Sequence, residues 1–350
     1  MIRGELERAL LHSDLKELKA IVDAELVELS SKIAWFGLSD QMSYAVLSYG
    51  KRLRPIMTLL STASVGGEKK EAVDLALALE LMHTATLVHD DVLDNDATRR
   101  GLSTVHKKWS VGEAILTGDA LLSLALSLIV NYGREVLKVF SEAGMLLAEG
   151  EYLDLVSFRE LSEEMYLKRI GRKSASLFRA ATECGALIGK GSPLEVSTLS
   201  RFGENFGMAY QVRDDILDIT DVETGEISPD LKQKRVTLPI IHLLSRMDEQ
   251  EKEALYGDIE KLADETEPDR LACFNSVVQL LNEAGSLDYC IDKVNFYIQS
   301  ALEEIQPIDD TVFKKHLTDM TRSLVIYPQA YAHQPPISRG IVRSEFQKRG

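Results

Sequence analysis

Four aspartates are crowded into one short stretch of the chain. They are Asp90, Asp91, Asp94 and Asp96. A helix advances about 100° per residue, so Asp90 and Asp94 would share one helix face, where like charges cost roughly 0.2–0.5 kcal/mol per pair. A divalent cation bound between them would remove this repulsion. The stretch is therefore a candidate metal site, although a single motif of this kind also fits a solvent-exposed acidic helix end.

The acidic pattern recurs 124 positions later (214 − 90), where Asp214 begins a second cluster. If the two segments meet at one cavity, Asp90, Asp94 and Asp214 can hold Mg²⁺. This hard cation takes oxygen ligands and keeps positions open for water and phosphate oxygens. Gln211 precedes Asp214 by three residues and lies on the same helix face. The repeat strengthens the prediction of a metal site.

Residues that could bind an anion accompany the acidic clusters. They are Lys51, Arg54, Arg99, Arg100 and Lys173. Guanidinium groups match phosphate geometry, and the helix expected after Lys51 and Arg54 would add backbone donors and a favourable dipole. His83 lies seven residues before Asp90, two turns back on the same face, so it can point into the same cavity. A histidine packed in the core is the alternative at that position.

The composition limits the class of protein. The formal net charge is −15 and the pI is about 5.0, which argues against a nucleic-acid-binding surface. The three cysteines form no CxxC motif, so neither a disulfide framework nor a thiolate zinc site is expected. The N-terminal segment lacks the apolar core of a signal peptide, and the most apolar run, residues 120–130, is too short to cross a bilayer. We expect a cytoplasmic protein without a transmembrane span.

Apolar residues recur at helical spacing along almost the whole chain, which predicts an all-α fold. Helices are expected over residues 71–91, across most of 135–189 and over 194–220. Residues 221–237 are polar with Gly225 and Pro229, so they are expected to form a loop or lid. We predict one helical domain, residues 1–325, and a flexible basic tail, residues 326–350, which carries three prolines and a net charge of +3.

Taken together, these motifs resemble those of the trans-isoprenyl (polyprenyl) diphosphate synthases. The matching segments are GKRLRP (50–55), HDDVLD (89–94), RRG (99–101), KSA (173–175) and, after Gln211, DDILD (214–218). They occur in the family's order over roughly residues 5–325. The resemblance implies an antiparallel helix bundle around a deep central cavity, usually in a homodimer. It also implies the condensation of isopentenyl diphosphate with an allylic diphosphate.

The resemblance further assigns roles to single residues. Asp90, Asp94 and Asp214 would bind Mg²⁺. The allylic diphosphate would be held by Arg99 and Lys173, and Arg235 keeps the charge of a family lysine. Isopentenyl diphosphate would be held by Lys51, Arg54, His83 and Arg100. Lys173, Ser174 and Gln211 fall where the family places dipoles near the allylic cation, and the released diphosphate is the family's usual proton acceptor.

One departure leaves an alternative open. Glu226 stands where the family usually has a lysine, and an acid there would repel a diphosphate. A weakly active or non-catalytic subunit of a heteromeric synthase is therefore the second reading. A class I terpene cyclase, which also uses an aspartate-rich motif, is less well matched because it needs neither Lys51 nor Arg54.

Product length depends on the residues before the first acidic cluster. In this family a large aromatic residue four or five positions before the first aspartate closes the product tunnel early. Here those positions are Thr86 and Ala85, with Met82 one turn deeper. Because the first two side chains are small, we expect a product of C20 or longer.

Overall fold

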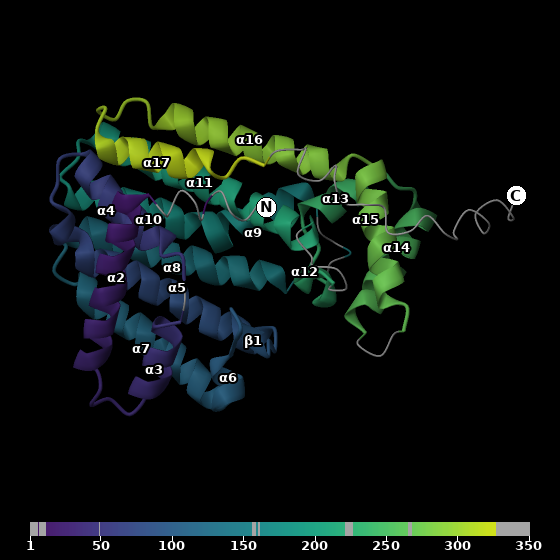
Figure 1. Ribbon diagram of the computed structural model, residues 1–350, viewed down its shortest axis with the longest axis horizontal. Coiled ribbons are helices and arrows are strands. Elements are labelled where there is room, and N and C mark those ends of the chain that lie inside the picture. The colour runs from purple at the N-terminus through teal and green to yellow at the C-terminus, as the bar shows by residue number, and fades with distance from the viewer. Residues whose placement is uncertain are drawn as a thin grey trace, which may run out of the picture.

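The computed structural model describes residues 6, 12–48, 50–155, 159, 162–220, 227–264 and 268–326. In this part of the chain nearly all regular structure is helical, which confirms the predicted all-α fold (Figure 1). The helices of the first half are α2 (Ser13–Lys32), α3 (Ser39–Val46), α4 (Leu53–Ser64), α5 (Val73–Leu93), α6 (Val105–Lys108), α7 (Val111–Ile129) and α8 (Arg134–Asp154). Those of the second half are α9 (Glu163–Ile170), α10 (Ser176–Ile188), α11 (Pro193–Thr220), α12 (Pro229–Lys232), α13 (Leu238–Leu244), α14 (Glu249–Ala263), α15 (Arg270–Glu283), α16 (Ser286–Glu304) and α17 (Val312–Arg322).

Helix α5 lies at the centre of the first half of the bundle. It follows a short 3₁₀ turn, η1 (Lys69–Ala72), and packs against α4 and α7. Every side chain from residue 75 to residue 82 is buried. Since α5 is apolar on most of its faces, it needs neighbours all round. In the second half, α11 packs against α10 and α16, and α10 also contacts α4, which joins the two halves.

The structure differs from the sequence prediction in three places. The helical region expected over residues 135–189 is divided into α8, α9 and α10, and a π-helical turn, η3 (Gly171–Ala175), separates the last two. Two short strands, β1 (Thr98–Arg99) and β2 (Leu102–Ser103), form a hairpin where a loop was expected. Within the expected loop 221–237, the described residues 227–237 include the short helix α12. Single π turns carry no strong sequence pattern, and neither do two-residue strands.

Two helical stretches are long and apolar enough to cross a membrane by length and composition alone. They are Lys69–Leu93 and Val111–Ile129. The most apolar 18 residues of the first are 67% buried in the molecule, and those of the second are 33% buried. The first has the burial of a core helix. The second exposes apolar side chains, among them Ile115 and Leu116. The absence of a transmembrane span stays a prediction.

A buried arginine connects the N-terminal helices to α5. Arg52 adopts a left-handed backbone conformation (φ 53°) immediately before α4. Its guanidinium donates to Glu80 at 2.7 Å and to Asp23 at 2.9 Å, and Nη2 donates to the carbonyls of Val46 and Ser48. Arg52 and Glu80 are only 5% and 4% exposed. These contacts hold α2, the end of α3, the start of α4 and α5 in one arrangement.

We expect Arg52→Met to lower the free energy of unfolding by roughly 3–5 kcal/mol, because it leaves the buried carboxylate of Glu80 without its partner charge. Urea denaturation followed by circular dichroism measures this loss. Lys70→Met is the control, since it breaks the exposed Lys70–Glu68 pair and should cost less than about 1 kcal/mol. Equal losses in the two variants would contradict a structural role for the Arg52–Glu80 pair.

Candidate active site

The first acidic cluster lies at the C-terminal end of α5. Asp90 and Asp91 are buried in its last turn, and Asp94 is the C-cap. The helix ends where Asn95 takes a left-handed conformation (φ 56°), as is common just after a C-cap. The C-terminal end of a helix carries partial negative charge, so aspartates there repel the helix dipole as well as one another. This end of α5 requires cations.

Three basic side chains supply those cations. Lys173 Nζ lies 2.5 Å from a carboxylate oxygen of Asp154, 2.7 Å from Glu151 and 3.2 Å from Asp90. Arg99 contacts Asp91 at 2.5 Å and lies 3.6 Å from Asp90. The third is Arg235, which is paired with Asp94 and lies 3.8 Å from Asp90. The cations predicted to bind the allylic diphosphate are thus placed beside the predicted metal ligands.

The acids still outnumber the cations, and burial shifts several of their pKa values. Burial raises the pKa of Asp91 to about 6 and that of Glu151 to about 7. Burial and the charge of Asp90 raise the pKa of Asp94. Burial would also raise the pKa of Asp90, but the charges of Lys173 and Arg235 outweigh it and lower that pKa. A set of oxygen ligands with surplus negative charge fits a hard divalent cation such as Mg²⁺.

The two acidic segments meet through the residues around α12. Ser228 donates to Asp218 of the second cluster, and the backbone N–H of Asp230 lies 3.4 Å from the same carboxylate. Seven residues after Ser228, Arg235 pairs with Asp94 of the first cluster. Burial and the charge of Asp218 raise the pKa of Asp230 well above its usual range. Residues 228–235 therefore form a bridge between the two acidic helix ends.

The π turn η3 carries Lys173 and Ser174. It approaches α8 so closely that a Cβ added at Gly150 would lie 2.5 Å from the backbone nitrogen of Lys173. Ser174 Oγ donates to the side-chain carbonyl of Gln211 at 2.5 Å. Two of the three residues predicted to lie near the reacting cation, Ser174 and Gln211, are thus in contact. π turns are frequent at functional sites because they redirect side chains within a helix.

A buried network behind Gln211 holds its side chain in place. The amide of Gln211 donates to Asp215 at 2.7 Å, and the hydroxyl of Tyr166 donates to the other oxygen of Asp215 at 2.6 Å. Burial raises the pKa of Asp215 to about 7. Asp214, the next residue back, is exposed on α11. Adjacent aspartates therefore have different surroundings, one orienting Gln211 and the other open to solvent.

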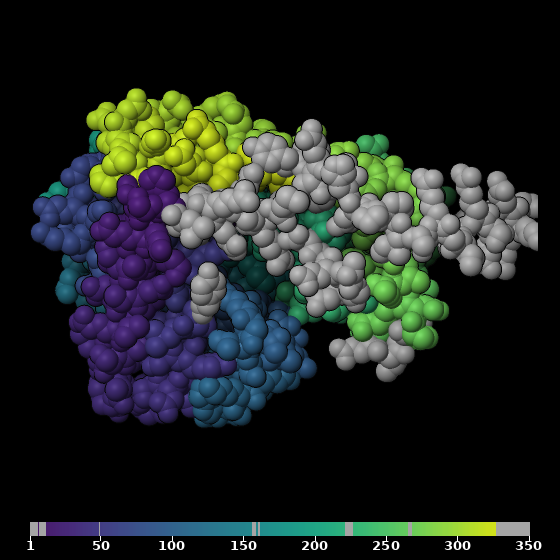
Figure 2. All heavy atoms as spheres, viewed as in Figure 1, coloured from purple at the N-terminus to yellow at the C-terminus, as the bar shows by residue number. Residues whose placement is uncertain are grey.

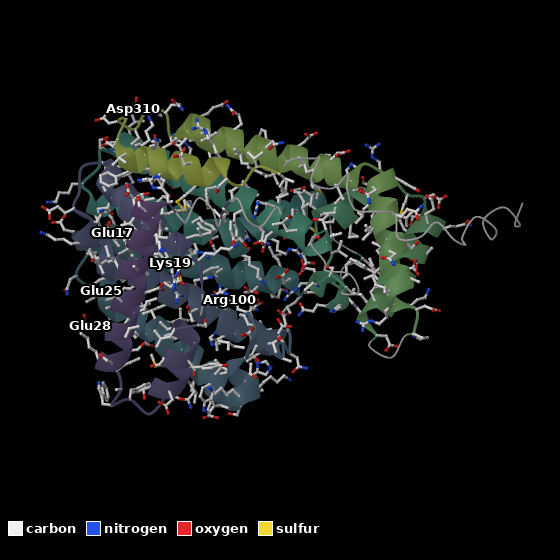
Figure 3. The ribbon with its side chains drawn as sticks, viewed as in Figure 1. Glu17, Lys19, Glu25, Glu28, Arg100 and Asp310 are labelled. Carbon is white, nitrogen blue, oxygen red and sulfur yellow. The ribbon has the colours of Figure 1, made fainter. Side chains whose placement is uncertain are left out.

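The hairpin of β1 and β2 presents the two arginines that follow the first cluster. Arg99 pairs with Leu102, and the turn residues Arg100 and Gly101 both have positive φ (53° and 79°), as the tight turns of two-residue hairpins require. Arg99 turns back to the aspartates. Arg100 is exposed at the turn and is labelled near the middle of the molecule in Figure 3. A Cβ added at Gly50 would lie 3.0 Å from its Nη1.

A second group of basic residues surrounds His83. The guanidinium of Arg54 lies 4.3 Å above the ring of Phe178, and its buried Nε has no hydrogen-bond partner among the described residues. Burial, followed by the charges of Arg54 and Arg100, lowers the pKa of His83 well below its usual value. Lys51 is half-buried. A buried donor without a partner next to further cations suits an anionic ligand.

The sequence analysis missed several residues of this site. Glu151 and Asp154 face Lys173 from α8, Asp230 joins the second cluster, and Tyr166 positions Asp215. The i, i+3 spacing of Glu151 and Asp154 placed them on one helix face, but nothing in the sequence indicated that this face meets Lys173. Glu226 and the tail from residue 327 onward lie outside the described residues.

Comparison with known proteins gives the same assignment as the site. The polyprenyl synthetase family model matches residues 37–275. The chain is 31% identical over 313 residues to a short chain isoprenyl diphosphate synthase of Methanothermobacter thermautotrophicus, covering 85% of this chain and 92% of the relative. It is 34% identical over 301 residues to an all-trans-nonaprenyl-diphosphate synthase (geranyl-diphosphate specific) of Rhodobacter capsulatus, covering 84% and 90%. The chain belongs to the polyprenyl synthetase family.

A solved structure supports the fold assignment. The polyprenyl synthase of Caulobacter crescentus, solved with calcium and isoprenyl diphosphate, superposes with a TM-score of 0.79 at 28% identity, covering 91% of this chain and 97% of that one. The protein is thus a prenyltransferase of isoprenoid biosynthesis with the all-α isoprenoid synthase fold.

Gly150→Ala should impair catalysis, because its new methyl group would push the backbone of Lys173 out of position. We expect the turnover number to fall roughly tenfold to a hundredfold, as small displacements of catalytic groups do. Gly257→Ala is a matched control inside another helix, where an added Cβ meets nothing within 4 Å. The control should retain activity and gain about 0.5–1 kcal/mol of stability. Full activity in Gly150→Ala would show that the π turn tolerates displacement.

Proposed function

We propose that the protein is an all-trans polyprenyl diphosphate synthase. It would join isopentenyl diphosphate to an allylic diphosphate with the help of Mg²⁺ and release a product of C20 or longer. The observation that carries this proposal is the bridge that residues 228–235 make between the two acidic helix ends, with Lys173 beside the first of them. Such a site can bind a divalent cation and a diphosphate together, because it offers carboxylate ligands and cationic donors side by side.

The allylic diphosphate would bind between these two kinds of group. Asp90, Asp94 and Asp214 would hold Mg²⁺, which supplies positive charge to the departing diphosphate. Lys173 and Arg235 would turn from the carboxylates to the phosphate oxygens once that charge is present. Charge stabilisation of the leaving group favours breakage of the C–O bond. The lid residues around α12 would close over the substrate, since they already bridge the two acidic segments.

Isopentenyl diphosphate would bind at the second basic group. Arg54 supplies a buried donor that has no partner among the described residues, and it acts with Arg100 on His83, whose imidazole is kept neutral. Lys51 would contribute a further charge there. This arrangement supports separate binding of the two diphosphates, so that only the allylic one lies against the acids. The double bond can then attack the allylic carbon.

The allylic cation would form near the π turn. Ser174 and Gln211 present oxygen dipoles there, and the buried Asp215 and Tyr166 hold those dipoles in place. The C–O bond would break first to give this cation, the new C–C bond would then form from the double bond of isopentenyl diphosphate, and one proton must leave the condensed product. The departing diphosphate is the proposed acceptor for that proton.

The residues deeper along α5 support a long product. Ala85 is fully buried and small, and Thr86 is half-buried. One turn deeper, the methyl group of Met82 lies close to Gly144 of α8, 3.3 Å from where a Cβ at that glycine would stand. The growing tail would run along this face of α5, which carries no Phe, Tyr or Trp, and would reach Met82.

We also propose that two copies of the chain form a homodimer in the cytoplasm. Helices α7 and α8 expose apolar side chains. These are Ile115, Leu116, Leu126, Leu137, Met145 and Tyr152. Apolar surface of this extent favours burial against a partner. A second copy would cover it without requiring a membrane.

The alternative of a weakly active subunit depends on Glu226, which lies outside the described residues. All of the predicted metal ligands and basic residues within the described part of the chain are compatible with an active enzyme. Family membership argues against a terpene cyclase.

A product assay with labelled isopentenyl diphosphate and geranyl, farnesyl or geranylgeranyl diphosphate tests the activity. We expect elongation that requires Mg²⁺ and is abolished by EDTA. Asp90→Asn should reduce the turnover number about 10²–10³-fold, because it removes a charged ligand from the site. Asp288→Asn, which alters an exposed aspartate of α16, is the control and should be fully active. No incorporation with any primer would favour the partner-dependent subunit.

Ala85→Phe should shorten the longest product, because the ring would fill the space that the tail needs beside α5. Ala85→Ser keeps a small side chain and should leave the product length unchanged. Met82→Ala should permit longer products, since it removes the side chain one turn deeper. Chromatography of the dephosphorylated products measures all three. If Ala85→Phe and the wild type give the same products, the tail does not follow α5.

A further inference from the structure

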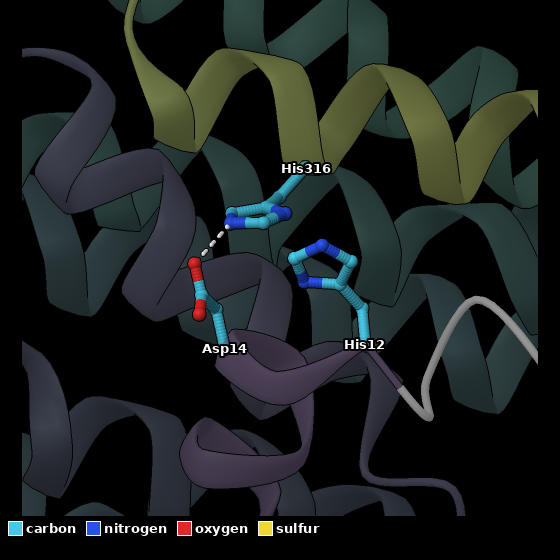
Figure 4. Close-up of side chains that lie close together, drawn as sticks. All are labelled: His12, Asp14 and His316. Atoms are coloured by element: carbon cyan, nitrogen blue, oxygen red, sulfur yellow. Dashed lines mark hydrogen bonds and ion pairs between the residues drawn. The ribbon is translucent and has the colours of Figure 1, made fainter.

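A cluster of metal-binding side chains lies outside the active site, where α2 meets α17. His12 immediately precedes α2, Asp14 lies in the first turn of that helix and His316 projects from α17 (Figure 4). Figure 2 shows the same two helices in contact at the surface, α2 in purple and α17 in yellow. One ligand atom from each of the three residues lies within 4.8 Å of the others.

The geometry of the cluster is close to that of a metal site. His316 Nε2 lies 3.1 Å from Asp14 Oδ2, and the rings of His12 and His316 meet edge to face with centroids 5.2 Å apart. Ligand atoms around a tetrahedral zinc ion with bonds near 2.0–2.1 Å would lie about 3.3 Å apart. The pair of His316 and Asp14 already has that separation. His12 is exposed, so its ring is able to rotate by the small amount needed.

Supporting contacts orient two of the three ligands. Ser13 Oγ donates to Asp14 Oδ1 at 3.0 Å, which directs the other carboxylate oxygen to His316. The imidazole of His316 is only 6% exposed and is held by its packing on α17. Contacts of this kind fix the orientation of metal ligands in known sites. A simple ion pair between Asp14 and His316 would explain their contact, but it would not explain why the imidazole of His12 lies beside them.

We propose that His12, Asp14 and His316 form a binding site for Zn²⁺ or a similar transition metal, which joins α2 to α17. Three protein ligands leave a fourth position for water. Imidazole nitrogens favour this class of metal, whereas the aspartates of the active site favour Mg²⁺, so the two sites differ in the ion that they select. The ligands come from positions 302 residues apart, and the bound ion would hold the two ends of the described chain together.

Calorimetric titration of Zn²⁺ into the full chain tests this site. The protein is first dialysed against EDTA and then into metal-free buffer with excess Mg²⁺, which occupies the active-site carboxylates. We expect one Zn²⁺ per chain and an increase in Tm of roughly 5 °C at saturating Zn²⁺. Co²⁺ in place of Zn²⁺ should give the visible absorption of a tetrahedral complex.

Three variants identify the ligands. His12→Ala and Asp14→Ala change exposed residues, so both should fold normally and bind Zn²⁺ at least tenfold more weakly. Glu17→Ala is the matched control, because it removes an exposed carboxylate one turn further along α2 (Figure 3) and should bind Zn²⁺ like the wild type. Prenyltransferase activity with Mg²⁺ should be unchanged in all three, which separates this test from that of the proposed function.

Two results would overturn the proposal. One is the absence of Zn²⁺ binding to the wild type. The other is Zn²⁺ binding of equal affinity in His12→Ala, Asp14→Ala and the wild type, which would place the ion elsewhere on the protein.

Discussion

Electrostatic repulsion among buried carboxylates shapes the site at the end of α5. Asp90, Asp91 and Asp94 lie where the helix dipole is already negative, and Glu151 and Asp154 approach from α8. Only a few cations are close enough to offset them, and each comes from a different part of the chain. The π turn brings Lys173, the hairpin brings Arg99, and the segment after α12 brings Arg235. Three irregular elements thus bring positive charge to the acids, and Arg169 of the regular helix α9 adds a further contact at 3.0 Å from Asp154.

The same charges prepare the site for its ligands. The pKa values of Asp94 and Glu151 are raised by burial and by the charge of Asp90, so their ionised forms are costly without a further cation, and a divalent cation bound there would stabilise them. In the proposed function, Lys173 and Arg235 would then become available to phosphate oxygens. The second basic group, around Arg54 and His83, has an excess of positive charge, so it suits an anion without a metal ion. The proposed function uses this difference in charge to keep the two diphosphates apart.

Much of the fold and of the site could be predicted because the relevant signals are local. Helical periodicity indicated the all-α class, and the start and end of α11 were found to within one residue of the expected 194–220. The acids, the basic residues and Gln211 belong to short motifs, and the spacing within a motif indicates which side chains share a helix face. The π turn, the hairpin and the roles of Glu151 and Asp230 could not be predicted, because each depends on which helices pack together. Gly150 illustrates this, since its lack of a side chain matters only where α8 meets η3.

The sequence by itself determined the helical class, the family and the chemical character of the site, because residue type and spacing along one helix are properties of the chain alone. Tertiary structure decided which charges become partners. Asp90 and Lys173 are 83 residues apart, and Asp14 and His316 are 302 apart. Contacts over such separations are made when apolar helix faces pack to exclude water, and the polar groups at the helix ends are then placed by that packing. Whether a carboxylate is buried beside a cation, and what its pKa becomes, is therefore a property of the folded molecule.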